Sequence, residues 1–285
     1  MRLTDRISVA EEDINNIYDQ DKIAIHFPGD GEEDSESINF ADYSKKSDAQ
    51  AIKCFAELNR TGGYIWAEYY TRRTVKVGKV KPSSFKIYLS RWSRERERGK
   101  HEKGSIAKLK TLQMEKVRRI EPGQAMNLRA VRPQQGTITK WHKARDNIEC
   151  LIENKPLRED WSSLFPAQQE AVCAEYLRDP DFEECARLEF LLLPVGRTLK
   201  DVDICGMARD GKEIFAQVTN YKKNDPKCRK KIETLKHYKH GRSQLAFFCV
   251  CSGVLEEDGI MFVPTERVFS WLKKHEAYYR RLLDK

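Results

Sequence analysis

The sequence has 285 residues and a formal net charge of +8, with 40% hydrophobic and 34% charged residues. This length and polarity predict two globular units, each with a modest core. No apolar run reaches the roughly 18 residues that cross a bilayer, which excludes a membrane-spanning helix. The opening residues, MRLTDRISVAEED, lack the apolar centre of a signal peptide, so we expect a cytoplasmic protein.

The positive charge is concentrated in two segments, one in each half of the chain. Between Arg91 and Arg119 eleven Lys and Arg residues stand against four acids, and between Lys222 and Arg242 nine stand against two. A single charge run is often only a solvated surface. Two concentrated runs fit a polyanionic partner better, and they predict contact with nucleic acid.

The eight cysteines lack the spacing of a metal site. They contain no C-x-x-C pair, and most stand among apolar residues. Zinc sites draw their ligands from closely spaced pairs, and disulfides belong to oxidising compartments. We therefore expect reduced, buried thiols.

The first half alternates like strands around one apolar helix. Its predicted elements are a strand at 21–27, an acidic loop at 29–36, a helix capped by Ser47 and ended by Gly62-Gly63, strands within 64–81, a charged loop at 91–105, strands at 109–120 and 125–131 around Pro122-Gly123, and a helix at 139–153. Many strands with few helices predict a small β-barrel over residues 1–153.

A linker is expected at 153–161, where Pro156 and charged residues interrupt the pattern. The second half then predicts a mixed sheet with helices on both faces. Its elements are a helix from Pro166, strands at 188–196, 201–208 and 213–221, a basic helix from Pro226 to His240, a buried parallel strand at 244–253, a strand at 260–264 and a helix from Thr265. The fold class is thus α/β (α+β overall), with the second domain at 160–285.

A hairpin in the second half carries polar residues where a core is expected. Asp210-Gly211 joins two strand-like runs, which is a strong hairpin signal. Asp203 stands between Val202 and Ile204, and Gln217 and Thr219 share one face of the next strand. A buried carboxylate without a partner is costly, so Asp203 lies near an open strand end or takes part in chemistry.

These residues resemble the PD-(D/E)XK nuclease core, and in particular Mrr-type restriction endonucleases, over about residues 165–255. The motifs are Glu170 in QQEAVCAEYL, then VDICG around Asp203, then AQV around Gln217. The resemblance implies that Glu170, Asp203 and Gln217 bind Mg²⁺ (or Mn²⁺) and that the catalytic set also includes position 219. Two carboxylates suit Mg²⁺, which orients and activates water for phosphodiester hydrolysis.

The sequence departs from this family at Thr219, where the family has lysine. A neutral hydroxyl cannot lower the pKa of water by its charge. Lys223 shares the strand face but lies about 13 Å further along, at roughly 3.3 Å per residue, and Lys222 points to the other face. Either a lysine folds back, or the metal alone activates the water, or the site no longer cleaves.

The first half, over about residues 20–150, resembles PUA-like domains of the EVE and YTH types, on the run IAIHF, the following helix and GGYIWAEYYTRRTVKVGKV. Such domains hold a flipped, often modified base in an aromatic pocket, which implies that Tyr64, Trp66, Tyr70 and Trp92 are candidates for that pocket. The alternative for each single ring is a place in the core of the barrel.

Two classes of function follow. The first is a modification-dependent DNA endonuclease of prokaryotic defence, with DNA bound along a basic segment comprising Lys222, Lys223, Lys227, Arg229, Lys230 and Lys231. The second is a nucleic-acid-binding sensor or specificity module that does not cleave. Convergence of Glu170, Asp203 and Gln217 would favour the enzyme, and a salt bridge to Asp203 would favour the binding module.

Three further points stay open at the level of sequence. RNA is an alternative partner to DNA. Cleavage of both strands by one site per chain would call for a homodimer. A sensor of small nucleotide signals is the third functional class, and it ranks last because no phosphate-cradling Gly-rich loop is present.

Overall fold

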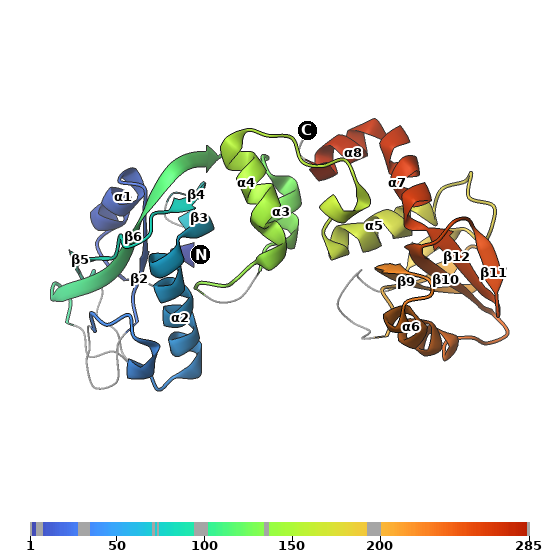
Figure 1. Cartoon of the computed structure of the whole chain (residues 1–285), viewed down its shortest axis with the longest axis horizontal. Helices are drawn as coiled ribbons and strands as arrows, with labels where there is room; N and C mark the ends of the chain where they lie inside the picture. Colours follow the sequence, from blue (N-terminus) through green and yellow to red (C-terminus); the bar gives the residue numbers. More distant parts are fainter. Residues whose placement is uncertain are drawn as a thin grey trace. The chain divides into compact units, whose positions relative to one another are not determined.

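A computed structural model describes residues 2–3, 8–27, 35–69, 72, 74–93, 102–133, 137–192 and 201–283. The chain separates into two compact units, Met1–Leu157 and Arg158–Lys285, each with its own sheet and core (Figure 1). The boundary lies within 153–161, the segment that sequence analysis assigns to a linker. None of the described helices has both the length and the apolar character needed to cross a bilayer.

The first unit combines one sheet with helices and short helical turns. Its elements are β1 (Arg2–Leu3), α1 (Glu11–Asp19), β2 (Lys22–Ile25), η1 (Phe40–Asp42), α2 (Lys46–Thr61), β3 (Gly63–Tyr69), β4 (Thr74–Val80), β5 (Lys86–Arg91), β6 (Ile106–Ile120), α3 (Met126–Val131), η3 (His142–Ala144) and α4 (Arg145–Glu153).

In this curled sheet one long strand, β6, pairs with different strands along its two halves. The strand order is β1-β3-β4-β6-β2, and β5 also pairs with β6. The first part of the 15-residue β6 pairs with β2 and β5, and its second part pairs with β4 (Figure 1). The result is a half-barrel whose core is completed by α1 and α2.

The segment 125–131 is not a strand, contrary to the sequence-based prediction. After the turn at Pro122-Gly123 it forms the short helix α3. The guanidinium of Arg129 donates to the carbonyl oxygens of Ile120, Glu121 and Gln124, and so closes the turn before the helix. A short apolar run has no periodicity that separates strand from helix, so the sequence pattern alone does not distinguish them.

The second unit contains a six-stranded sheet with helices on both faces. Its elements are η4 (Trp161–Ser163), α5 (Pro166–Tyr176), β7 (Leu188–Leu191), β8 (Ile204–Ala208), β9 (Glu213–Lys222), α6 (Pro226–Lys236), β10 (Ser243–Val250), β11 (Leu255–Glu257), β12 (Ile260–Pro264), α7 (Thr265–Lys274) and α8 (Glu276–Leu283).

The strand order of this sheet is β11-β12-β10-β9-β8-β7, and β10 runs parallel to both of its neighbours. Alternate residues of β9 face opposite layers, as a strand requires. Ala216 and Val218 belong to the core shared with α5 and α7, and Phe215 belongs to the core under α6. The predicted fold class is confirmed: the chain is mixed α/β, with a curled half-barrel followed by a mixed sheet flanked by helices.

Local signals set the elements that carry the candidate site. Pro166 opens α5, and the side chain of Gln168 accepts a hydrogen bond from the backbone of Phe165 at 2.8 Å. At the start of α6 the N-cap residue itself is the acceptor, because the side chain of Asp225 accepts from the N–H of Lys227 at 2.8 Å. Gly211 takes a φ of +82° in the β8–β9 turn, a conformation that favours glycine.

Candidate functional site

Asp203 lies at the point where pairing between β8 and β9 begins. Its backbone N–H donates to the carbonyl of Ala216 at 2.9 Å, and its carboxylate Oδ2 accepts from the N–H of Val218 at 2.7 Å. These two contacts flank Gln217 and hold the carboxylate against β9. Asp203 is therefore fixed by the backbone of the neighbouring strand, in a partly accessible position at the end of β8.

Glu170 is an electrostatic neighbour of Asp203, although 33 positions separate them in the sequence. It extends from α5, and its Oε2 is buried without a hydrogen-bond partner among the described residues. Burial raises the pKa of Glu170 to about 7, the negative charge of Asp203 adds to this rise, and the ammonium of Lys231 opposes it. Lys231 of α6 is thus paired with Asp203, and Glu170 of α5 is within electrostatic range of both.

Gln217 and Thr219 are buried on β9, the strand that pairs with β8. The amide Nε2 of Gln217 donates to the carbonyl of Asp201, and its Oε1 is buried without a partner in the described part of the chain. The hydroxyl of Thr219 accepts from the N–H of Tyr221 at 3.4 Å. No hydrogen bond between described residues joins Gln217 to either carboxylate, so the structure places the amide near Asp203 through the strand register alone.

Carboxylate and amide oxygens, which the residues of this site supply, are ligands that suit a hard divalent cation. Two buried oxygens, Oε2 of Glu170 and Oε1 of Gln217, have no partner among the described residues, and Asp203 adds a carboxylate. Mg²⁺ is commonly held by one or two carboxylates and keeps several waters. Within the described ranges no group of three or more His, Cys, Asp and Glu side chains could hold a metal, so waters and substrate would have to complete the coordination shell.

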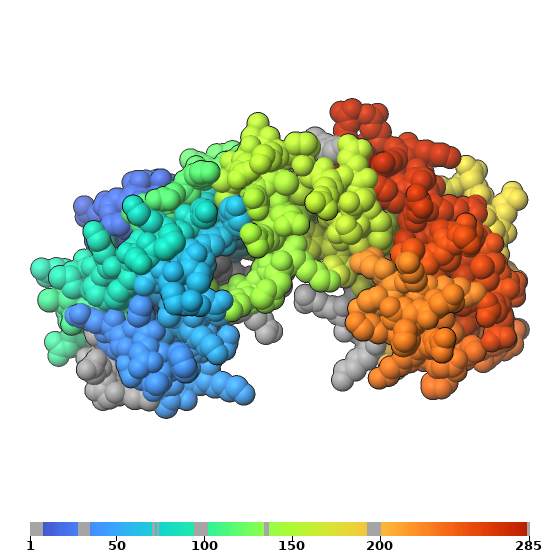
Figure 2. Space-filling model, viewed as in Figure 1, coloured from blue at the N-terminus to red at the C-terminus, as the bar shows by residue number. Residues whose placement is uncertain are grey.

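The basic segment after the hairpin divides into two groups. Lys222, Lys227, Arg229 and Lys230 are exposed, and the last three lie on α6, whose outer surface is orange in Figure 2. Lys223 is instead paired with Glu257 and lies 4.4 Å from the centre of the Phe262 ring. Lys227 donates to the hydroxyl of Tyr221 at 3.3 Å on the surface. The exposed group can contact a phosphate backbone, whereas Lys223 is held against the sheet.

Lys231 belongs to the acidic site rather than to the outer surface of α6. Its Nζ lies 3.8 Å from Oδ2 of Asp203 and donates to the carbonyl of Val218 at 3.1 Å. From the sequence, Lys231 is predicted only as a phosphate contact. Of the two features that were to discriminate between the functions, the structure contains the ion pair of Asp203. Glu170 is an electrostatic neighbour of Asp203, and the side-chain hydrogen bond described for Gln217 goes to the carbonyl of Asp201 rather than to either carboxylate.

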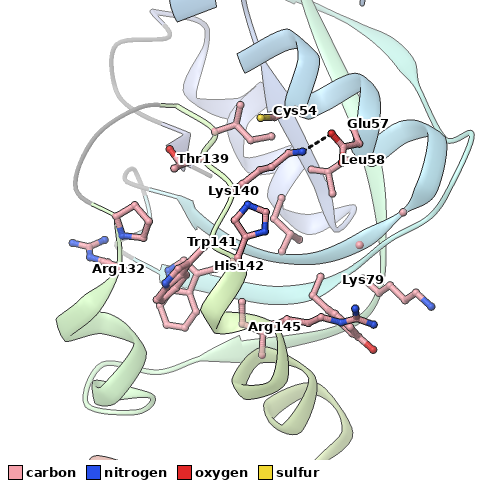
Figure 3. Close-up of a pocket in the computed structure, with 18 of the residues that line it drawn as sticks. Cys54, Glu57, Leu58, Lys79, Arg132, Thr139, Lys140, Trp141, His142 and Arg145 are labelled. Atoms are coloured by element: carbon pink, nitrogen blue, oxygen red, sulfur yellow. Dashed lines mark hydrogen bonds and ion pairs between the residues drawn. The ribbon is translucent and has the colours of Figure 1, made fainter. Parts of the chain in front are cut away.

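The first unit contains a pocket of about 600 Å³ between α2, β3 and the segment before α4 (Figure 3). Tyr64 and Trp66 of β3 line one part of the pocket, and Trp141 and His142, from the segment before α4, line another part. Further lining residues are Glu57, Glu68, Lys79, Arg132, Lys140 and Arg145. The pocket is large enough for a small ligand or a nucleobase.

A polar pair and two indole rings define one wall of the pocket. The Nε1 of Trp66 donates to Oε1 of Glu68 at 3.0 Å, and Glu68 forms an ion pair with Arg132. Trp66 meets Trp141 edge to face, with ring centres 6.4 Å apart. Figure 3 shows Lys140 reaching Glu57 from the same segment as Trp141, at 2.6 Å. Trp66 is buried, whereas Trp141 is half-exposed and accessible to a ligand.

Two predicted pocket residues lie elsewhere. Trp92 is buried in the core and packs against His26 with ring centres 4.8 Å apart, so it does not line the pocket. Tyr70 lies outside the described residues. Trp141 and Arg132 line the pocket but were not predicted, because they come from segments with no strand or pocket motif of their own.

Comparisons with known proteins give no family for this chain. No family model matches it, and no curated protein matches it. Among solved structures, a repair endonuclease from Pyrococcus abyssi matches at 11% identity over 71% of this chain and 74% of its own. The TM-score is 0.18, which is too low for this likeness to support an argument about fold or function.

Proposed function

We propose that the chain is a metal-dependent endonuclease that acts on DNA containing a modified base. The proposal is supported by the electrostatic proximity of Glu170 to Asp203, which precedes β8, and by two buried oxygens, Oε2 of Glu170 and Oε1 of Gln217, that have no hydrogen-bond partner among the described residues. Polar atoms in such surroundings are costly unless a ligand satisfies them. Oxygen donors next to a lysine suit a divalent cation and a phosphate group together.

The residues of the second unit have separable tasks in this proposal. Asp203 and Glu170 would hold Mg²⁺ or Mn²⁺, with the amide oxygen of Gln217 as a further ligand. Bound there, the cation would lower the pKa of a water molecule and neutralise charge on the phosphate. Lys227 and Lys230, exposed on α6, would bind the DNA backbone without reading its sequence.

The first unit would supply the selectivity for modified DNA. Its pocket offers the half-exposed ring of Trp141 for stacking and the Glu68–Arg132 pair for hydrogen bonds to the edge of a base. Flipping a base costs a few kcal/mol, and stacking on an aromatic ring contributes about 1–3 kcal/mol. Recognition of altered bases suits prokaryotic defence, and cleavage of both strands would need two copies of the chain.

A cleavage assay tests the proposal. Purified full-length protein is incubated with phage DNA that does or does not carry modified cytosine, in Mg²⁺ and in Mn²⁺. We expect cleavage of the modified DNA only, lost in Asp203→Asn. Asp210→Asn is the matched control, because it removes an exposed carboxylate from the turn of the same hairpin. Intact DNA in every reaction would refute the endonuclease.

The second candidate is a nucleic-acid-binding module that does not cleave. Thr219 in the place of a lysine and the ion pair between Lys231 and Asp203 favour it. Such a module would retard DNA or RNA in a gel, and its affinity would fall strongly as the salt concentration rises. Neither added metal nor Asp203→Asn would change that affinity.

A further inference from the structure

We propose that Lys231, reaching the acidic site from α6, supplies the positive charge that Thr219 cannot. This inference rests on the proposed endonuclease and names a further catalytic residue of the same site. It begins from a geometric fact: the ammonium of Lys231 lies at the carboxylate of Asp203, 28 positions away in the sequence.

The position of Lys231 is set by contacts on two elements. Its Nζ donates to the carbonyl of Val218 at 3.1 Å, and Val218 donates its own N–H to Asp203 at 2.7 Å. The same stretch of β9 therefore holds both the lysine and the carboxylate. Because α6 packs on β9, the lysine reaches the site from the helix rather than from the strand.

The other candidate cations are less suitable. Lys223 is engaged with Glu257 and with the ring of Phe262, and Lys222 is exposed beyond the site at the end of β9. Thr219 is buried and its hydroxyl carries no charge. Of the lysines on β9 and α6, Lys231 is the one with a described ion pair to Asp203.

Lys231 also retains donors for a ligand. An ammonium has three N–H groups, and one of them is given to Val218. The 3.8 Å separation from Asp203 is a charge interaction longer than a hydrogen bond. With 39% of its side chain exposed, the ammonium remains accessible to a phosphate group.

In hydrolysis, the oxygen of a water molecule bonds to phosphorus while the bond to the leaving oxygen breaks. The electron pair of that bond stays on the leaving oxygen, which takes a proton from solvent, and the attacking water releases a proton to solvent. Negative charge grows on the non-bridging oxygens during this step. Lys231 donates to one of these oxygens and stabilises the charge as it develops.

The test compares steady-state cleavage by four variants of the full-length protein. We expect Lys231→Gln to lower kcat about 10²- to 10³-fold with little change in KM, the usual effect of losing one charge-stabilising donor. Lys231→Arg should recover at least about a tenth of the kcat, because arginine keeps the charge. Lys230→Gln, on the outer face of α6, should raise KM instead. Lys212→Gln, an exposed lysine in the hairpin turn, controls for the loss of one positive charge.

Each outcome decides the inference. If Lys231→Gln raises KM as Lys230→Gln does and keeps its kcat, Lys231 is only a backbone contact and the inference is wrong. It is also wrong if Lys231→Gln binds Mn²⁺ more tightly in calorimetry with kcat unchanged, because the lysine would then be only a counter-ion. If wild-type protein does not cleave in either metal, the endonuclease fails and this role fails with it. Wild-type cleavage that Asp203→Asn abolishes separates the two cases.

Discussion

Replacing Glu170 by glutamine is expected to stabilise the metal-free protein at alkaline pH. Burial and the charge of Asp203 raise the pKa of Glu170 to about 7, whereas an unfolded chain would titrate near its ordinary 4.5. Between pH 4.5 and about pH 7, Glu170 keeps its proton in the folded state but has lost it in the unfolded state. The contribution of Glu170 to the free energy of unfolding is therefore fully present below about pH 4.5. It falls as the pH rises and is lost above about pH 7.

The size of the effect follows from the two pKa values. At 1.36 kcal/mol for each pH unit, the difference between 4.5 and about 7 sets an upper limit of about 3.4 kcal/mol. Glu170 is only partly buried, and solvent screens its charge, so about 1–2 kcal/mol is a realistic expectation. At pH 8 the Glu170→Gln protein should be more stable by this amount, and at pH 4 the two proteins should be equal.

Denaturant unfolding in EDTA at pH 4 and pH 8, followed by circular dichroism, measures this difference. Glu175→Gln is the matched control, because it removes a carboxyl from the exposed side of the same helix. An equal difference at both pH values, or a less stable Glu170→Gln protein at pH 8, would refute the electrostatic argument. If Glu170→Gln is more stable at pH 8, the wild-type protein keeps a charged group at a cost in stability, which is common in ligand-binding sites.

Three further predictions concern the metal, the sheet and the pocket. Mg²⁺ at 100 times its dissociation constant should stabilise wild-type protein by about 2.7 kcal/mol at pH 8, and calorimetric melting should show no such gain for Asp203→Asn. Gly206→Ala should lower the free energy of unfolding by about 1–3 kcal/mol in urea titrations, because its Cβ would lie 2.2 Å from a methyl of Leu188 and 2.6 Å from the carbonyl of Phe190. Trp141→Ala should weaken binding of a modified oligonucleotide by about 1–3 kcal/mol in fluorescence anisotropy, whereas Trp141→Phe keeps an aromatic face and should retain most of the affinity.

Most elements of the second unit could be predicted because their signals are local, although β11 and α8 were missed. Pro166 marks the start of α5, Asp210-Gly211 marks the hairpin, and the apolar run at 244–253 overlaps the buried parallel strand β10. Helix caps, turns and apolar periods depend on neighbouring residues in the chain. The first unit was harder, since α1 was missed and the short run at 125–131 suited strand and helix alike.

The candidate site could be predicted in part. The motifs of the second half singled out Glu170, Asp203 and Gln217, and in the structure Glu170 is an electrostatic neighbour of Asp203. Trp66 lines the pocket, but its ring is buried and forms part of the wall rather than a stacking surface. Alternation along a strand indicates which side chains share a face, and that is enough to group residues on one element.

The candidate residues and the elements that carry them could be read from the amino-acid sequence alone: two acids, an amide, Thr219, and a basic helix after the hairpin. Which of these residues contact one another depends on how the elements pack. Packing of α6 on β9 brings Lys231 to Asp203, and the path of the chain before α4 brings Trp141 beside Trp66, while Trp92 goes to the core. Contacts between separate elements depend on how the faces of helices and sheets pack together. Neither the periodicity of a single element nor its cap residues specify that packing.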